Sequence, residues 1–116
     1  MGMTIVVTGG RAYSDRARVN DVLDRLHHVN PITLLAEGRA FGADMLAAQW
    51  ARVAGVGCRG FQAEWGRHGK DAGPIRNRQM LEAVMPDLVV AFPGKYGTRN
   101  CVQQAEAMGL FVYEVQ

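Results

Sequence analysis

The chain has 116 residues, of which 48% are hydrophobic and 21% are charged. This length and balance predict one ordinary globular domain, residues 1–116, with a hydrophobic core of its own. The formal net charge is only +2, which argues against a nucleic-acid coat protein or a membrane-surface protein.

The first half of the chain has the pattern strand, helix, strand, helix. The apolar run MTIVVT at 3–8 is strand-length, and Asp15 can cap a following helix whose apolar residues recur every three or four positions. A second apolar run, ITLLAE at 32–37, precedes a helix that opens near Gly42. Trp50 lies at helical spacing from apolar neighbours in that helix, so we expect it in the core rather than at a ligand.

A third strand is expected in GVGCRGF at 55–61. It is followed by a long connection over 62–73, and connections of that length are usually functional or disordered. The aromatic and basic residues of this connection argue against disorder. Pro74 then suits the first turn of a third helix.

The chain closes with the run DLVVAF, a helix that Thr98 can cap and that stops at Gly109, and the run LFVYEV. Several of these runs are continuously apolar, which is typical of parallel strands covered on both faces. The order of elements predicts an α/β fold, a Rossmann-like doubly wound parallel five-stranded sheet of order 3-2-1-4-5 with helices on both faces. Ligands of such sheets bind outside the carboxyl ends of the strands where the chain reverses direction, here between strands 1 and 4.

The loops that follow strands 1 and 4 are rich in glycine and border this expected crevice. Glycines let backbone N–H groups approach a phosphate, and the N-terminus of each following helix adds favourable partial charge. We interpret both loops as phosphate-binding turns, although glycine in the first could serve only a tight turn. Neither loop matches a Walker A motif, and the first lacks the third glycine of the dinucleotide fingerprint, so we predict no cofactor. The candidate ligand-binding residues are Gly9, Gly10, Arg11, Pro93, Gly94, Lys95, Gly97 and Thr98.

The segment after the second strand supplies three more candidates. Glu37, at the strand end, could bind a ribose hydroxyl, with Gly38 beside it. Asp44 could cap the next helix or face the ligand.

The segment from the long connection into the third helix supplies the remaining candidates. Arg76 can present a planar pair of donors to a phosphate, although a surface salt bridge would also explain it. Lys70 and Asn77 are weaker candidates, and Trp65 could stack on a base or close over the core. None of the three histidines has a cysteine or carboxylate at metal-ligand spacing, so we expect no metal site.

Four motifs together resemble the SLOG superfamily: GxR near the start, EGxxxGAD, WxxxGKxAGPxRN and DLVVAFPGxxGT. The likeness is greatest to its small YspA-type, cpYpsA-related members of bacteria and phages, and runs from about Val6 to Val112. It implies a Rossmann-like fold that binds a nucleotide or nucleotide-derived molecule. The superfamily includes LOG-type phosphoribohydrolases, DNA-processing proteins and predicted sensors of nucleotide signals.

Two positions depart from the LOG pattern PGGxGTxxE. Lys95 replaces its second glycine, and Cys101 replaces its glutamate, a residue that assists glycosidic cleavage. The resemblance therefore favours a binding module, either a sensor or a sequestering protein for a signalling nucleotide. One alternative is a nucleotide N-glycosidase in which Glu37 or Asp44 does the acid–base work, and we assign no other catalytic residue. Another is a DNA-handling accessory, by analogy with the DNA-processing relatives, which the weak net charge disfavours.

The expected partner is a nucleotide-derived small molecule, with no membrane and no nucleic acid. A homodimer or higher homo-oligomer is expected, because the chain has candidate apolar faces, although core packing would explain the same residues. These residues are Met80, Leu81, Val84, Met85 and Met108. The two cysteines, Cys58 and Cys101, follow no disulfide spacing, and neither a bilayer-spanning run nor a signal peptide is visible. We therefore expect a cytoplasmic location, in a bacterial cell or in the host of a phage.

Overall fold

The computed structural model describes residues 2–116 and contains a five-stranded sheet of order β3-β2-β1-β4-β5. All four neighbouring strand pairs are parallel. The predicted doubly wound α/β sheet of order 3-2-1-4-5 is therefore confirmed. The strands are β1 (Met3–Thr8), β2 (Ile32–Glu37), β3 (Gly57–Gly60), β4 (Leu88–Ala91) and β5 (Val112–Glu114).

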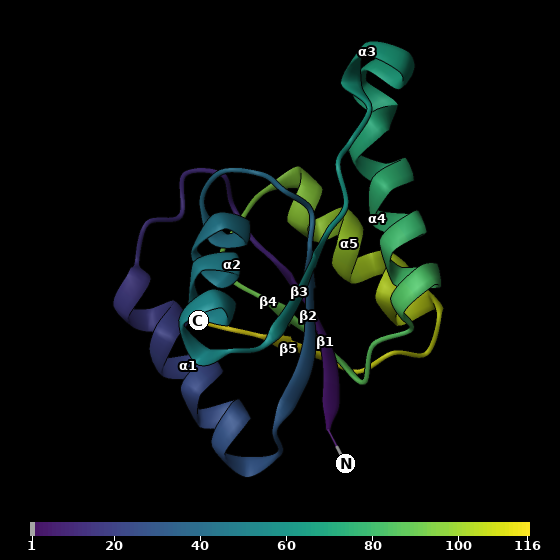
Figure 1. Cartoon of the computed structure of the whole chain (residues 1–116). Helices are drawn as coiled ribbons and strands as arrows, with labels where there is room; N and C mark the ends of the chain where they lie inside the picture. Colours follow the sequence, from purple (N-terminus) through teal and green to yellow (C-terminus); the bar gives the residue numbers. More distant parts are fainter. Residues whose placement is uncertain (1) are drawn as a thin grey trace.

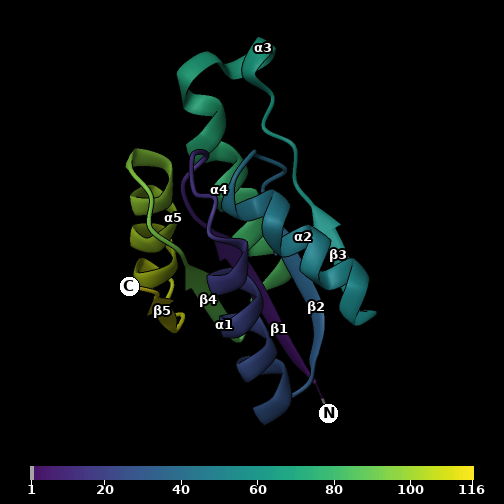
Figure 2. The same ribbon diagram turned by 90° about the vertical axis from the view of Figure 1, so that its left-hand side faces the viewer.

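Helices cover both faces of the sheet, with α1 and α2 on one side and α4 and α5 on the other (Figures 1 and 2). The long connection predicted over 62–73 is largely helical, because it contains the short helix α3 and a 3₁₀ turn, η1. Figure 1 shows α3 and the N-terminal part of α4 standing beyond the end of the sheet. The helices are α1 (Arg16–Val29), α2 (Ala43–Ala54), α3 (Trp65–His68), α4 (Ala72–Val84) and α5 (Tyr96–Ala107), and η1 is Gly69–Asp71.

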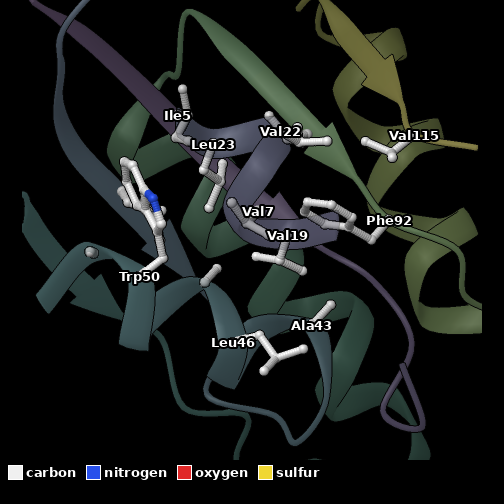
Figure 3. Close-up of a cluster of buried hydrophobic side chains, with 14 of the residues drawn as sticks. Ile5, Val7, Val19, Val22, Leu23, Ala43, Leu46, Trp50, Phe92 and Val115 are labelled. Atoms are coloured by element: carbon white, nitrogen blue, oxygen red, sulfur yellow. The ribbon is translucent and has the colours of Figure 1, made fainter. Parts of the chain in front are cut away.

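The strand residues alternate between two hydrophobic clusters, one on each face of the sheet. Ile5 and Val7 pack in the cluster under α1 and α2, whereas Val6 between them packs under α4 and α5. Figure 3 shows the first cluster, in which Phe92 and Trp50 are the largest side chains. Trp50 is 6% exposed and belongs to the core, as expected from its spacing.

Of the two side-chain caps predicted from the sequence, the cap of α1 is present and the cap of α5 is absent from the described residues. Asp15 caps α1, since its Oδ1 accepts from the N–H of Arg18 at 3.0 Å. The predicted cap by Thr98 is wrong, because α5 begins at Tyr96 and no side chain caps its N-terminus. The Thr98 hydroxyl lies instead against Gly94, within the turn that precedes the helix.

Most of the apolar residues considered for a subunit interface belong to the core. Met80 and Leu81 are buried, and Val84 and Met108 pack against the same cluster, whereas Met85 is 57% exposed. Within residues 2–116, no helix has the length and apolar character needed to cross a membrane.

Candidate functional site

A cavity of about 710 Å³ lies beside the loops that follow β1 and β4, at the carboxyl ends of these strands. All the predicted ligand-binding residues line this cavity except Glu37, Gly38 and Asn77. Its lining is Thr8, Gly9, Gly10, Arg11, Ala12, Tyr13, Ala40, Asp44, Trp65, Lys70, Gly73, Pro74, Arg76, Pro93, Gly94, Lys95, Tyr96, Gly97 and Thr98.

The turn between β4 and α5 brings a helix N-terminus to the cavity. The first turn of an α-helix carries N–H groups that have no acceptor within the helix. No side chain caps these groups in α5, and Tyr96, Gly97 and Thr98 of its first turn line the cavity. Free N–H donors and the partial positive charge of the helix end suit a phosphate at this point.

The loop after β1 lines the cavity and also contacts the loop after β4. The N–H of Gly10 donates to the carbonyl oxygen of Pro93 at 2.9 Å, so this donor is already used to join the two loops. The loops approach so closely that a Cβ on Gly94 would lie 2.7 Å from the Gly10 nitrogen. The N-terminus of α1 is capped by Asp15 and contributes no residue to the cavity lining. The expectation that both helix ends face the ligand is therefore wrong for α1.

Arg76 reaches the cavity from α4 and is held by three acceptors. Its Nη1 donates to the carbonyl oxygens of Gly38 and Phe61, the latter at 3.4 Å, and its Nε donates to Asn77 Oδ1 at 2.9 Å. No described residue accepts from Nη2, and no buried side-chain nitrogen or oxygen in residues 2–116 lacks a partner, so Nη2 is open to solvent on a residue that lines the cavity. A fixed guanidinium with one free nitrogen can donate to a phosphate with little loss of side-chain entropy.

Asp44 supplies a carboxyl group to the same part of the cavity. It is 5% exposed, and its Oδ2 accepts from the N–H groups of Gly38 at 3.1 Å and Ala40 at 3.4 Å. Gly42 rather than Asp44 is the N-cap of α2, so Asp44 holds the preceding loop instead of capping its helix. By the same reasoning as for Arg76, its other oxygen, Oδ1, keeps access to the cavity. Burial, and secondarily the charge of Glu37, raises the pKa of Asp44 to about 7.

Of the three predicted residues outside the cavity, Gly38 and Asn77 hold residues that line it, whereas Glu37 holds Arg39, which does not. Glu37 is 5% exposed, and its Oε1 accepts from the N–H of Arg39 at 2.6 Å. Asn77 is 3% exposed and its Nδ2 donates to Asn100 Oδ1 at 3.1 Å, while its own Oδ1 holds Arg76. Gly38 borders a second, smaller cavity.

One wall of the cavity is aromatic. Trp65 is 44% exposed, and the Arg11 guanidinium lies 5.1 Å from the centroid of its ring. Tyr13 and Tyr96 also line the cavity, and the sequence reasoning missed both. Tyr96 lies inside the PGxxGT turn and Tyr13 lies two residues after Arg11, so both stand beside residues that the sequence had marked.

The charges around the cavity are unequal. Arg11, Lys70, Arg76 and Lys95 line it, and Asp44 is the one acidic residue among the lining residues described above. This excess of cations in a concave site attracts anions.

Cys101 occupies the position of the LOG glutamate, but it cannot replace that residue. Its side chain is fully buried, and it does not line the cavity. Burial raises the pKa of the Cys101 thiol to about 11, so the thiol stays protonated at neutral pH. No group of three or more His, Cys, Asp or Glu residues in the described part of the chain is arranged to hold a metal ion.

Known proteins resemble this chain in sequence and in structure. Residues 3–68 match the model of a family described as YAcAr, the YspA, cpYpsA-related SLOG family. The Gene 61 protein of Mycobacterium phage D29 is 37% identical, over 91% of this chain and 90% of its own length. In structure, the chain resembles DNA processing protein A (DprA) of Streptococcus pneumoniae, with a TM-score of 0.81 and 19% identity. That match covers 99% of this chain but only 50% of DprA, so the chain spans half the length of that protein.

At 19% identity, the likeness to DprA shows the fold alone. The match to the family model covers more than half of the chain, and the phage relative covers nearly all of it. Membership of this family indicates a nucleotide-related binding or processing role. The chain belongs to the YspA, cpYpsA-related SLOG family.

Proposed function

We propose that this chain is a nucleotide-binding domain that holds a nucleotide-derived ligand in the crevice between the loops after β1 and β4. The observation that carries the proposal is the meeting of two phosphate-binding features in one cavity. These features are the uncapped N-terminus of α5 and the free Nη2 group of Arg76.

The parts of a nucleotide have matching surfaces in the cavity. A phosphate binds between the first turn of α5 and Arg76, and Lys95 adds charge beside it. The base stacks on the aromatic wall, where Trp65 presents an exposed ring. A ribose hydroxyl donates to Oδ1 of Asp44. The volume of about 710 Å³ lies in the range of small-molecule sites.

Binding without turnover is favoured because Cys101 stands where LOG enzymes carry a glutamate. A domain of this kind serves as a sensor or as a sink for a signalling nucleotide. The relative in Mycobacterium phage D29 supports a role of this kind in the cytoplasm of a bacterial host.

We further propose that the domain acts as a homodimer or a higher homo-oligomer. Met85 is the exposed member of the apolar set considered from the sequence. Analytical ultracentrifugation of the purified chain measures its oligomeric state. A monomer at every concentration would contradict this proposal.

A second candidate function is nucleotide N-glycosidase activity, and Asp44 is the observation that favours it. A carboxyl group with a pKa of about 7 can both donate and accept a proton at neutral pH. Asp44 lies in the same cavity as Arg76, so a phosphate on Arg76 would place a ribose near it.

Incubation with nucleotides distinguishes binding from cleavage. Purified protein is mixed with nucleoside monophosphates, cyclic nucleotides and cyclic dinucleotides, and each mixture is analysed by mass spectrometry before and after denaturation. We expect one ligand to leave the solution and to return intact on denaturation. Release of a free base and ribose phosphate would establish the glycosidase instead, and no change with any nucleotide would contradict both functions.

A further inference from the structure

A second cavity of about 190 Å³ adjoins the main one. The two cavities share Arg11, Ala40, Trp65 and Arg76, so these residues form the boundary between them. A ligand that occupies the main cavity and passes Arg76 would enter the second one.

The chemistry of the second cavity is that of an anion site. Arg11, Arg39 and Arg76 line it, and its described lining residues include no aspartate or glutamate. Three guanidinium groups without a lining carboxylate favour an anionic group such as a phosphate. The amide of Gln62 is a further polar group in the lining.

The size of the second cavity limits what it can hold. Sites for whole small molecules typically measure about 300–1,000 Å³, a range that includes the main cavity and excludes the second. A volume of 190 Å³ equals the share of roughly six water molecules in the liquid, which suits a phosphate group better than a second nucleoside.

The backbone that carries Arg39 is held in an uncommon conformation. Arg39 has a φ of 57°, in the left-handed region that glycine adopts without strain. Its N–H donates to Glu37 Oε1, and the preceding Gly38 is held by both Asp44 and Arg76. A non-glycine residue in such a conformation, fixed by buried neighbours, is a recurrent feature of ligand sites.

We propose that the second cavity is a subsite for a second phosphate group, so that the ligand is a nucleotide with two separated phosphates. This group is either a phosphomonoester, as in a nucleoside 3′,5′-bisphosphate, or the phosphodiester of a dinucleotide. The inference rests on the proposed nucleotide-binding function. Arg76, which lines both cavities, contacts the ligand between its two phosphates.

Calorimetric titration of matched ligands tests the subsite. Adenosine 5′-monophosphate is compared with adenosine 3′,5′-bisphosphate, the guanosine pair is treated likewise, and a cyclic dinucleotide forms a third arm. The test variant is Arg39→Gly, which removes the guanidinium and suits the φ of 57°, so that the fold is retained. The control is Arg59→Ala, because Arg59 is also exposed and lies 4.6 Å from the Phe61 ring but lines neither cavity.

We expect the wild-type chain to bind a bisphosphate about tenfold more tightly than the monophosphate, as one charge-assisted contact provides. Arg39→Gly should bind the bisphosphate no more tightly than the monophosphate, while its affinity for the monophosphate stays within about twofold of the wild type. Arg59→Ala should still bind the bisphosphate more tightly. If the Arg39-dependent gain occurs only with the cyclic dinucleotide, the second group is a phosphodiester.

Three results would overturn the subsite. If the monophosphate binds and neither the bisphosphate nor the dinucleotide binds more tightly, the site for a second phosphate is refuted and the nucleotide-binding function stands. The same holds if Arg39→Gly lowers the affinity for all ligands equally. Failure of every nucleotide to bind would refute the proposed function as well.

Discussion

Arg76 and Asp44 hold the same residue, Gly38, through its two backbone groups. Nη1 of Arg76 donates to the Gly38 carbonyl oxygen, and Oδ2 of Asp44 accepts from the Gly38 N–H at 3.1 Å. The two side chains form no direct ion pair within 4.0 Å in the described part of the chain, but the charge of Arg76 still acts to lower the pKa of Asp44. Nη2 of Arg76 and Oδ1 of Asp44 take no part in these bonds and stay available to a ligand.

Replacing Arg76 should weaken the binding of any phosphate-bearing nucleotide. The charge-assisted hydrogen bonds that Arg76→Ala removes contribute roughly 1.5–3 kcal/mol, which corresponds to a loss of about tenfold to a hundredfold in affinity by calorimetry. Cys101→Ala is the comparison, because Cys101 is buried and lines no part of the cavity. Equal affinities of the two variants would remove Arg76 from the site.

Asp44 should make the stability of the protein depend on pH. Its carboxyl ionises near the ordinary value of 3.8 in the unfolded chain and at about 7 in the folded protein. Between these values the folded state binds a proton that the unfolded state has lost, so stability falls as pH rises from about 4 to 7 and is then constant. The full difference corresponds to roughly 4 kcal/mol.

Asp44→Asn keeps an oxygen for the Gly38 N–H but cannot ionise, so most of this fall should disappear. Urea denaturation at pH 5 and pH 8 measures the change in stability. Asp21→Asn is the control, because the Asp21 side chain is 44% exposed. A smaller fall should remain, because burial also raises the pKa of Glu37. Parallel stability profiles for Asp44→Asn and the wild type would show that Asp44 ionises normally.

Gly94, in the turn before α5, and Gly97, in the first turn of α5, should respond differently to alanine. A Cβ on Gly94 would lie 2.8 Å from Thr98 Cβ as well as near Gly10, so Gly94→Ala should destabilise the fold by about 1–3 kcal/mol. A Cβ on Gly97 meets no atom within 4 Å, and Gly97 lies in the first turn of α5. Gly97→Ala should leave the melting temperature unchanged or slightly raised.

Gly97→Ala nevertheless places a methyl group in the cavity, and we expect it to reduce nucleotide affinity. Thermal melts and titrations of both variants separate folding from binding. Undiminished affinity in a stable Gly97→Ala protein would argue that the phosphate lies elsewhere.

The two tryptophans provide a direct optical assay. Trp65 is 44% exposed and lines the cavity, whereas Trp50 is 6% exposed and its Nε1 donates to Asp24 Oδ1 at 2.8 Å. A base that stacks on Trp65 should quench its fluorescence. The quenching should vanish in Trp65→Phe and persist in Trp50→Phe, and the reverse pattern would place the ligand away from the aromatic wall.

The sheet could be predicted from the sequence because its signals are local. Apolar runs, their separation by helical patterns and the handedness of crossovers suffice to fix the strand order. The convergence of Arg76, Lys95 and Asp44 on one cavity follows from the same topology, since their segments begin at the carboxyl ends of the strands.

The remaining features depend on contacts between distant segments. The Gly10 N–H appears free in the sequence, yet Pro93, 83 positions later, accepts its hydrogen bond. Likewise, Asn77 supports Arg76 rather than lining the cavity, because Asn100 and Gly97 of α5 lie beside it. No local pattern encodes such pairings.

Amide chemical-shift mapping of the ¹⁵N-labelled protein during titration with a bound nucleotide tests the central claim most directly. We predict the largest changes at the backbone N–H groups from Gly94 to Thr98 and at the Arg76 side chain, because the phosphate binds between them. Changes confined to the surface between α1 and α2, with Gly94 to Thr98 unaffected, would contradict the account.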